Sequence, residues 1–182
     1  PILSFALNGL WLGRVNRRAA GILSCLLAFA NLAWAAGLIA QFRGLLPGDG
    51  QGVSGAFIPW EFNWMHFYGT LDAPFGFYLD PISVMMLGVV ATISFLVQVY
   101  SLGYMRDDAS SGRFFALLSL FTFSMLGLVA SMSLIQLFVF WELVGVSSYL
   151  LISFWYEKPS AVAAGKKAFI ITRFADSFFL LG

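Results

Sequence analysis

Glu142 is the residue whose type and position in this sequence could most directly do chemistry. It is the only charged residue in the apolar run Leu134 to Trp155, LIQLFVFWELVGVSSYLLISFW, which is long enough to cross a bilayer as a helix. A carboxylate deep in a membrane costs on the order of 2.5 kcal/mol or more on insertion scales. Such a residue is a functional-site candidate by default, and it needs a partner or a water-filled path.

Three further charged residues could act with Glu142, and all lie in the last apolar segment: Lys167, Arg173 and Asp176. At 1.5 Å of helix per residue, counted from the loop that joins the two helices, Glu142 lies ~20 Å deep and Asp176 ~22 Å deep. Arg173 and Asp176 are three residues apart, so they share a helix face and can pair. A low-dielectric site favours a neutral carboxylate and a nearby guanidinium favours a charged one, so this constellation can hold or pass a proton. Lys167 adds a cation that can snorkel or turn inward.

Composition indicates where these charges are housed. The chain has 182 residues, of which 60% are hydrophobic and 10% charged, whereas soluble domains carry about 25% charged residues. The formal net charge is +1, which gives no indication of nucleic-acid binding, and we expect no nucleic-acid partner. We therefore predict an all-α polytopic membrane protein whose partner is the lipid bilayer.

Apolar runs divide the chain into helices of one transmembrane domain spanning residues 1–182. Complete spans are predicted at 19–42, 81–102, 113–130 and 134–155, and partial spans at about 1–12 and 161–182. Asp80 is expected to cap the helix that begins at Pro81, because proline suits the first helical position. The two partial spans predict that the sequence is the N-terminal fragment of a larger subunit.

Residues 43–79 form the longest polar connection, which we predict to lie outside the membrane. Phe62, Trp64, Phe75, Phe77 and Leu79 alternate with other residues in two short runs, separated by GTLDAP. This alternation predicts a small β-hairpin at the membrane surface. Its aromatic residues suit the headgroup level.

The basic residues indicate the orientation. Eight of the ten lysines and arginines fall in or beside the first, third and fifth loops. By the positive-inside rule these loops face the cytoplasm, or the matrix side of an organelle, and the hairpin faces the opposite compartment. We expect a multi-pass protein of a bacterial inner membrane or of an equivalent organelle membrane.

Cofactor motifs do not appear in the sequence. The single cysteine, Cys25, lies in an apolar run, and there is no CxxC, GxGxxG or phosphate-binding GxxxxGK[ST] pattern. We therefore expect neither a cofactor-binding residue nor a metal ligand in this chain.

Several segments are specific enough to resemble a known family. These are FYLDPISVMM, VYSLGYM, the stretch from RFFALLSLF through FWELVGVSSYLLISFWY, and KKAFIITRFAD. They resemble the antiporter-like subunit L of respiratory complex I, the NADH:quinone oxidoreductase, and its close relative in the photosynthetic complex. The resemblance runs from about Phe75 to Gly182. It implies an inverted-repeat transporter fold of about fourteen helices, of which this sequence would hold the first part.

The resemblance also implies roles for individual residues. The glutamate of the WExVG segment falls on Glu142 and is implied to be the membrane carboxylate of a proton channel. The TRxxD pair falls on Arg173 and Asp176, and the lysine of KAF falls on Lys167. NAD, FMN, iron–sulfur clusters and quinone are implied for partner subunits, and neighbouring membrane-arm subunits are implied as partners.

Three hypotheses follow for function. The first is a proton-translocating membrane-arm subunit of NADH:quinone oxidoreductase, coupled to redox chemistry elsewhere in that enzyme. The second is a subunit of a multi-subunit Na⁺/H⁺ antiporter, a class that shares the WE and TRxxD features. The third is a structural scaffold whose buried charges only hold helices together.

Overall fold

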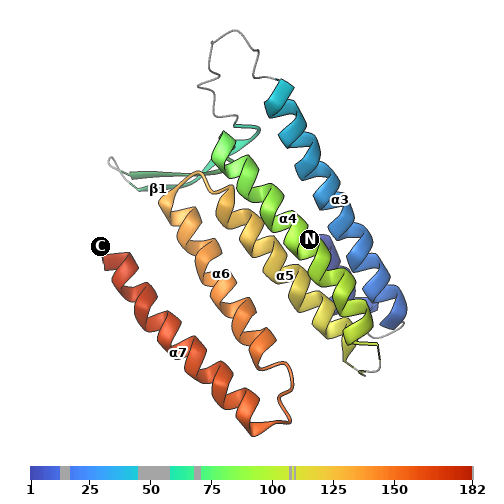
Figure 1. Cartoon of the computed structure of the whole chain (residues 1–182). Coiled ribbons are helices and arrows are strands. Elements are labelled where there is room, and N and C mark those ends of the chain that lie inside the picture. The colour runs from blue at the N-terminus through green and yellow to red at the C-terminus, as the bar shows by residue number, and fades with distance from the viewer. Residues whose placement is uncertain (13–16, 45–57, 68–70, 107, 109, 182) are drawn as a thin grey trace.

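The computed structural model describes residues 1–12, 17–44, 58–67, 71–106, 108 and 110–181. Long helices lie side by side in a bundle, and a two-stranded hairpin lies across one end of it (Figure 1). The α6–α7 loop lies at the other end of the bundle (Figure 1). The described elements are α1 (Ile2–Leu7), η1 (Asn8–Leu12), α3 (Arg17–Gly44), β1 (Glu61–Phe67), β2 (Leu71–Gly76), α4 (Pro81–Tyr104), α5 (Ser111–Val129), α6 (Leu134–Ile152) and α7 (Pro159–Leu181).

Every apolar run predicted to be a helix contains a helix among the described residues, but α6 ends at Ile152 rather than at Trp155. Within the described residues, four helices are long and apolar enough to cross a membrane: Ala19–Gln41, Pro81–Tyr104, Ser111–Val129 and Leu134–Ile152. Helix α7 has comparable length, but its lysines, arginine and aspartate make it less apolar, and it is not among the four. The predicted sixth span therefore stays a prediction.

Local signals explain where the helices begin. The Asp80 carboxylate accepts a hydrogen bond from the Ser83 backbone N–H at 2.6 Å, and Pro81 follows at the first helical position, as predicted. The hydrogen bonds from Ser83 hold the pKa of Asp80 below its ordinary value. The Ser133 hydroxyl accepts from the Gln136 N–H at 3.2 Å and caps α6 in the same way.

The hairpin is present, but its second strand begins earlier than the alternation predicts. Strand β2 covers Leu71–Gly76, so most of the segment GTLDAP is strand rather than turn. Pro74 favours a turn from sequence, because proline cannot donate a ladder hydrogen bond. It is tolerated here because its partner, Asn63, adjoins a register shift in β1. Residues 45–57 of the predicted loop lie outside the described residues.

Two apolar clusters hold the bundle together near its two ends. Near the hairpin, Leu79, Val84, Leu87 and Ala130 are buried together, and near the opposite end Met105, Leu117 and Phe154 are buried. Gly127 lies directly beneath the Phe140 ring, so any larger residue there would collide with α6. This close approach fixes α6 against α5.

The outer surface of the bundle is apolar. Large side chains are mostly exposed along the helices, including Trp34 (75%), Tyr100 (70%) and Phe174 (71%). Such surface is costly in water and suits a hydrocarbon environment. The fold is therefore that of a polytopic helical membrane protein with a small hairpin at one end of the bundle.

Candidate functional site

Helix α6 is anchored to the hairpin by one side chain, Gln136. Its amide donates to the Gly76 carbonyl at 2.9 Å and accepts from the Gly76 N–H at 3.1 Å, so it pairs with that peptide as a neighbouring strand would. Gln136 is only 2% exposed. The contact fixes the beginning of the helix that carries Glu142.

Helices α6 and α7 run antiparallel, and aromatic pairs join them at several levels. Near the α6–α7 loop, Gly165 packs closely on Ser153. Farther along, the Tyr149 and Phe169 rings lie 5.2 Å apart, and near the hairpin end the Trp141 and Phe179 rings stack at 6.0 Å. These contacts lie on both sides of the polar residues of the two helices.

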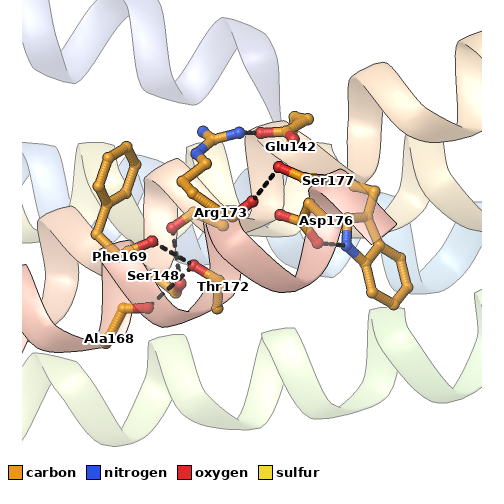
Figure 2. Close-up of polar contacts among 10 residues, drawn as sticks. Glu142, Ser148, Ala168, Phe169, Thr172, Arg173, Asp176 and Ser177 are labelled. Carbon is orange, nitrogen blue, oxygen red and sulfur yellow. Dashed lines mark hydrogen bonds and ion pairs between the residues drawn. The ribbon is translucent and has the colours of Figure 1, made fainter. Parts of the chain in front are cut away.

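Between the aromatic pairs, Glu142 of α6 forms an ion pair with Arg173 of α7 (Figure 2). Their side chains are 21% and 32% exposed, respectively. The Arg173 guanidinium also lies over the Phe169 ring, 4.8 Å from its centroid. At an effective dielectric constant near 20, opposite unit charges ~4 Å apart attract by about 4 kcal/mol.

Asp176 has a different partner from the one predicted. Its Oδ1 accepts a hydrogen bond from the Trp141 indole N–H at 2.8 Å, and the residue is 8% exposed. The expected pairing within α7 is replaced by two contacts between helices, one for each carboxylate. The long Arg173 side chain reaches across to α6, whereas the short Asp176 side chain meets the indole beside it.

Lys167 is the fourth predicted site residue, and the structure leaves it apart. Its side chain is exposed, and it lies six residues, or ~9 Å along the axis, before Arg173. The structure thus brings together Glu142, Arg173 and Asp176 but not Lys167.

Sequence reasoning missed two residues that position this site. Trp141 gives no usable signal, because no spacing rule indicates that its N–H faces α7. Gln136 does give a signal in the sequence, because it stands three residues after Ser133, as in a capping box. That pattern predicts a helix start but does not predict the contact with Gly76.

The arrangement can change its charge state. A proton bound by Glu142 would remove its negative charge and release the Arg173 guanidinium, which has Asp176 three residues away on its own helix. Each 100 mV of membrane potential is worth about 2.3 kcal/mol per charge moved across the whole membrane, which is of the same order as the attraction between opposite charges ~4 Å apart at an effective dielectric constant of about 20. Among the described residues, no group of three or more His, Cys, Asp or Glu could hold a metal ion.

Two family models match the chain and cover more than half of it together. One, described as NADH-Ubiquinone oxidoreductase (complex I), chain 5 N-terminus, matches residues 64–115. The other, described as NADH:quinone oxidoreductase/Mrp antiporter, TM, matches residues 131–182 and so includes all four predicted site residues. The chain belongs to the antiporter-like subunit L family of complex I.

Curated relatives of this chain come from different types of organism. It is 53% identical over 114 residues, 63% of its length, to NAD(P)H-quinone oxidoreductase subunit 5 of the Paulinella chromatophora chromatophore. It is 51% identical over 124 residues, 68% of its length, to the chloroplastic subunit 5 of Chara vulgaris. It is 54% identical over 104 residues, 57% of its length, to F(420)H(2) dehydrogenase subunit L of Methanosarcina mazei. The matched regions are 17%, 18% and 16% of those relatives, so the chain spans less than a fifth of their length.

A solved structure shows the same fold as this chain. The membrane-bound sulfane sulfur reductase, an archaeal respiratory membrane complex, contains a chain that superposes with a TM-score of 0.77. The match covers 100% of this chain and 34% of that one, at 17% identity. Relatives and structural neighbour alike are parts of multi-subunit membrane complexes.

Proposed function

We propose that the chain acts within a proton-translocating antiporter-like subunit of the membrane arm of a complex I-type quinone oxidoreductase. The observation that carries the proposal is the ion pair between Glu142 and Arg173, on neighbouring helices, with the buried Asp176 beside it. When the carboxylate of such a pair binds a proton, the guanidinium can leave it and pair with the second carboxylate. A purely apolar helix pair could not.

In this mechanism Arg173 moves between two carboxylates. Protonation of Glu142 removes its negative charge, and the guanidinium then turns to Asp176, which is within reach on the same helix. Loss of the proton from Glu142 to the opposite side restores the original pair. Lys167 is proposed to assist as a nearby cation that turns inward when the local charge becomes negative.

The redox chemistry belongs to other subunits in this proposal. NAD, FMN, iron–sulfur clusters and quinone are assigned to partner subunits, and neighbouring antiporter-like subunits are assigned as direct partners in the membrane arm. The name of the Methanosarcina mazei relative refers to F420H2 as the substrate of its own complex, so the electron donor varies within the family. We propose that the basic loops face the cytoplasm or matrix.

The test is Glu142→Gln in the intact complex, measured as proton pumping in sealed vesicles with assembly checked by native gel. Because glutamine keeps the size but cannot carry the proton, we expect pumping to fall by about 100-fold, the lower range for loss of a proton-transfer group. Coupled quinone reduction should fall with it. Glu157→Gln, the same change on an exposed loop, is the matched control and should pump normally.

Two outcomes would favour the other hypotheses. The family description of residues 131–182 includes the Mrp antiporters, so sodium-dependent proton exchange without an electron donor would favour an antiporter subunit. A Glu142→Gln complex that pumps normally but assembles poorly would favour a structural scaffold.

A further inference from the structure

A buried cluster of polar side chains lies away from Glu142, where α1, α3 and α5 meet. Its members are Ser4, Asn8, Ser24 and Ser119, each no more than 2% exposed. The Asn8 amide donates to the Ser24 hydroxyl at 2.6 Å and to the Ser4 hydroxyl at 3.3 Å. Ser4 in turn lies 3.1 Å from the Ser24 hydroxyl and 2.9 Å from the Ser119 hydroxyl. One connected network thus joins three helices.

Asn8 is not fully satisfied by this network. Its Oδ1 is buried and has no hydrogen-bond partner among the described residues. A buried amide oxygen without a partner is costly, and such groups in native proteins are ordinarily paired with protein or with an ordered water molecule. The network therefore leaves one acceptor open toward another ligand.

The same residue lines a pocket. The pocket has a volume of about 290 Å³ and lies between the end of α1 and the beginning of α5, with Ser110 and Arg113 also in its lining. Its remaining walls include Phe5 and Leu117. A buried water molecule needs two to four polar partners and occupies roughly 30 Å³, so a pocket of this volume can hold several water molecules.

The hydrogen-bonding pattern of the helix changes at Asn8. Asn8 begins the short π-helical segment η1, which follows α1 without a break. Single π-turns inside helices are rare and are found frequently at functional sites. Gly9 follows Asn8, and a methyl group at Gly9 would lie 4.0 Å from the Ala116 side chain of α5, an ordinary van der Waals distance. The two segments are therefore neighbours beside the pocket.

We propose that this pocket is an internal water-binding site, with the Asn8 Oδ1 as its deepest acceptor. Water enters from the end of the bundle that carries Arg106 and Arg113. It donates to Asn8, whose amide group links it to the hydroxyls of Ser24, Ser4 and Ser119. The site is built into the bundle independently of Glu142, so its hydration is tested without measuring activity.

The test is hydroxyl-radical footprinting of the assembled complex in membranes, with radicals generated from water by short X-ray pulses and oxidation read by mass spectrometry. Leu117 in the pocket and Leu87 in the apolar cluster near the hairpin are both 8% exposed, so they form a matched pair. If the pocket holds water, Leu117 should be oxidised faster than Leu87, because radicals then form from water molecules beside it. Equal rates in the wild-type complex would overturn the proposal.

Variants at Asn8 test the assigned acceptor. Asn8→Leu, which removes the oxygen at similar size, should lower the oxidation of Leu117 to the rate of Leu87. Asn8→Asp keeps an acceptor and should preserve fast oxidation. If Leu117 is oxidised equally fast in Asn8→Leu and in the wild type, Asn8 is not the acceptor and the proposal fails. If the Asn8→Leu complex does not assemble, the proposal is tested by the ratio of Leu117 to Leu87 oxidation in the wild type and in Asn8→Asp.

Discussion

At the residue scale, each of the two carboxylates has a partner from the other helix. Helix α6 supplies Trp141 and Glu142 in succession, and α7 supplies Arg173 and Asp176. Glu142 therefore has a charged partner and Asp176 a neutral one. The two acids are accordingly held in different electrostatic surroundings although they lie at the same level of the bundle.

The indole of Trp141 offers a test of this difference. Trp141→Phe removes the N–H that binds Asp176 but keeps an aromatic ring to stack on Phe179. We expect the complex to assemble and proton pumping to fall by roughly tenfold, about the effect of losing a hydrogen bond of 1.5 kcal/mol to a charged group. Pumping is measured in sealed vesicles.

The chain provides a matched control for that substitution. The Trp155 indole donates to the Asp108 carboxylate at 3.1 Å in an exposed loop contact. Trp155→Phe removes the same kind of bond outside the site and should leave pumping unchanged. Equal losses in the two variants would indicate a general effect of indole removal and would contradict a role for Trp141 at Asp176.

The ion pair between Glu142 and Arg173 should also affect how much complex assembles. Arg173→Gln leaves Glu142 without its cation, and breaking a fully buried pair costs about 3–5 kcal/mol. The cost should be smaller here because both side chains are partly exposed. We expect less assembled complex in Arg173→Gln, measured by native gel.

Adding Glu142→Gln to Arg173→Gln separates assembly from transport. Because the double variant lacks both charges of the ion pair, Glu142 is no longer left without its cation, and assembly should recover toward the wild-type level. Proton pumping should stay low, because the proton-carrying carboxylate is gone. A double variant that assembles worse than Arg173→Gln alone would contradict the ion pair as the cause.

At the element scale, the hairpin is tied to the helix that carries Glu142. Gln136 joins Gly76 to the first turn of α6, and the Tyr78 N–H bonds the Ala130 carbonyl just before α6 at 3.1 Å. Both contacts lie at one end of the bundle. A displacement of the hairpin is therefore transmitted to the beginning of α6.

Substitution of Gln136 should release the hairpin. Gln136→Leu removes both bonds to Gly76 and leaves its peptide unpaired on that side, at a cost of about 1–3 kcal/mol. We expect the Gly76 amide to exchange its hydrogen with solvent roughly 10- to 100-fold faster, as measured by mass spectrometry. Gln41→Leu, at an exposed glutamine of α3, should not change this rate.

At the scale of the whole molecule, the helices could be predicted from sequence because apolar length alone determines a membrane span. Partners across helices could not, because spacing along one helix led to the pairing of Arg173 with Asp176, whereas packing pairs it with Glu142. Pro74 misled the prediction of the second strand for a similar reason, because the register shift that tolerates it depends on the opposite strand. Ser4, Ser24 and Ser119 are minor polar interruptions in the sequence, and only the packing of three helices brings them together.

The two ends of the bundle should face opposite sides of the membrane. The hairpin and the α6–α7 loop lie at opposite ends of the bundle (Figure 1), and the basic residues gather at the end that carries the loop. By the positive-inside rule the loop end should face the cytoplasm or matrix. In a Cys25→Ala background, a membrane-impermeant maleimide should therefore label Glu157→Cys only in inside-out vesicles and Ile58→Cys only in right-side-out vesicles. The reversed pattern would overturn the orientation, whereas labelling of both positions from one side would contradict a bundle that crosses the membrane between them.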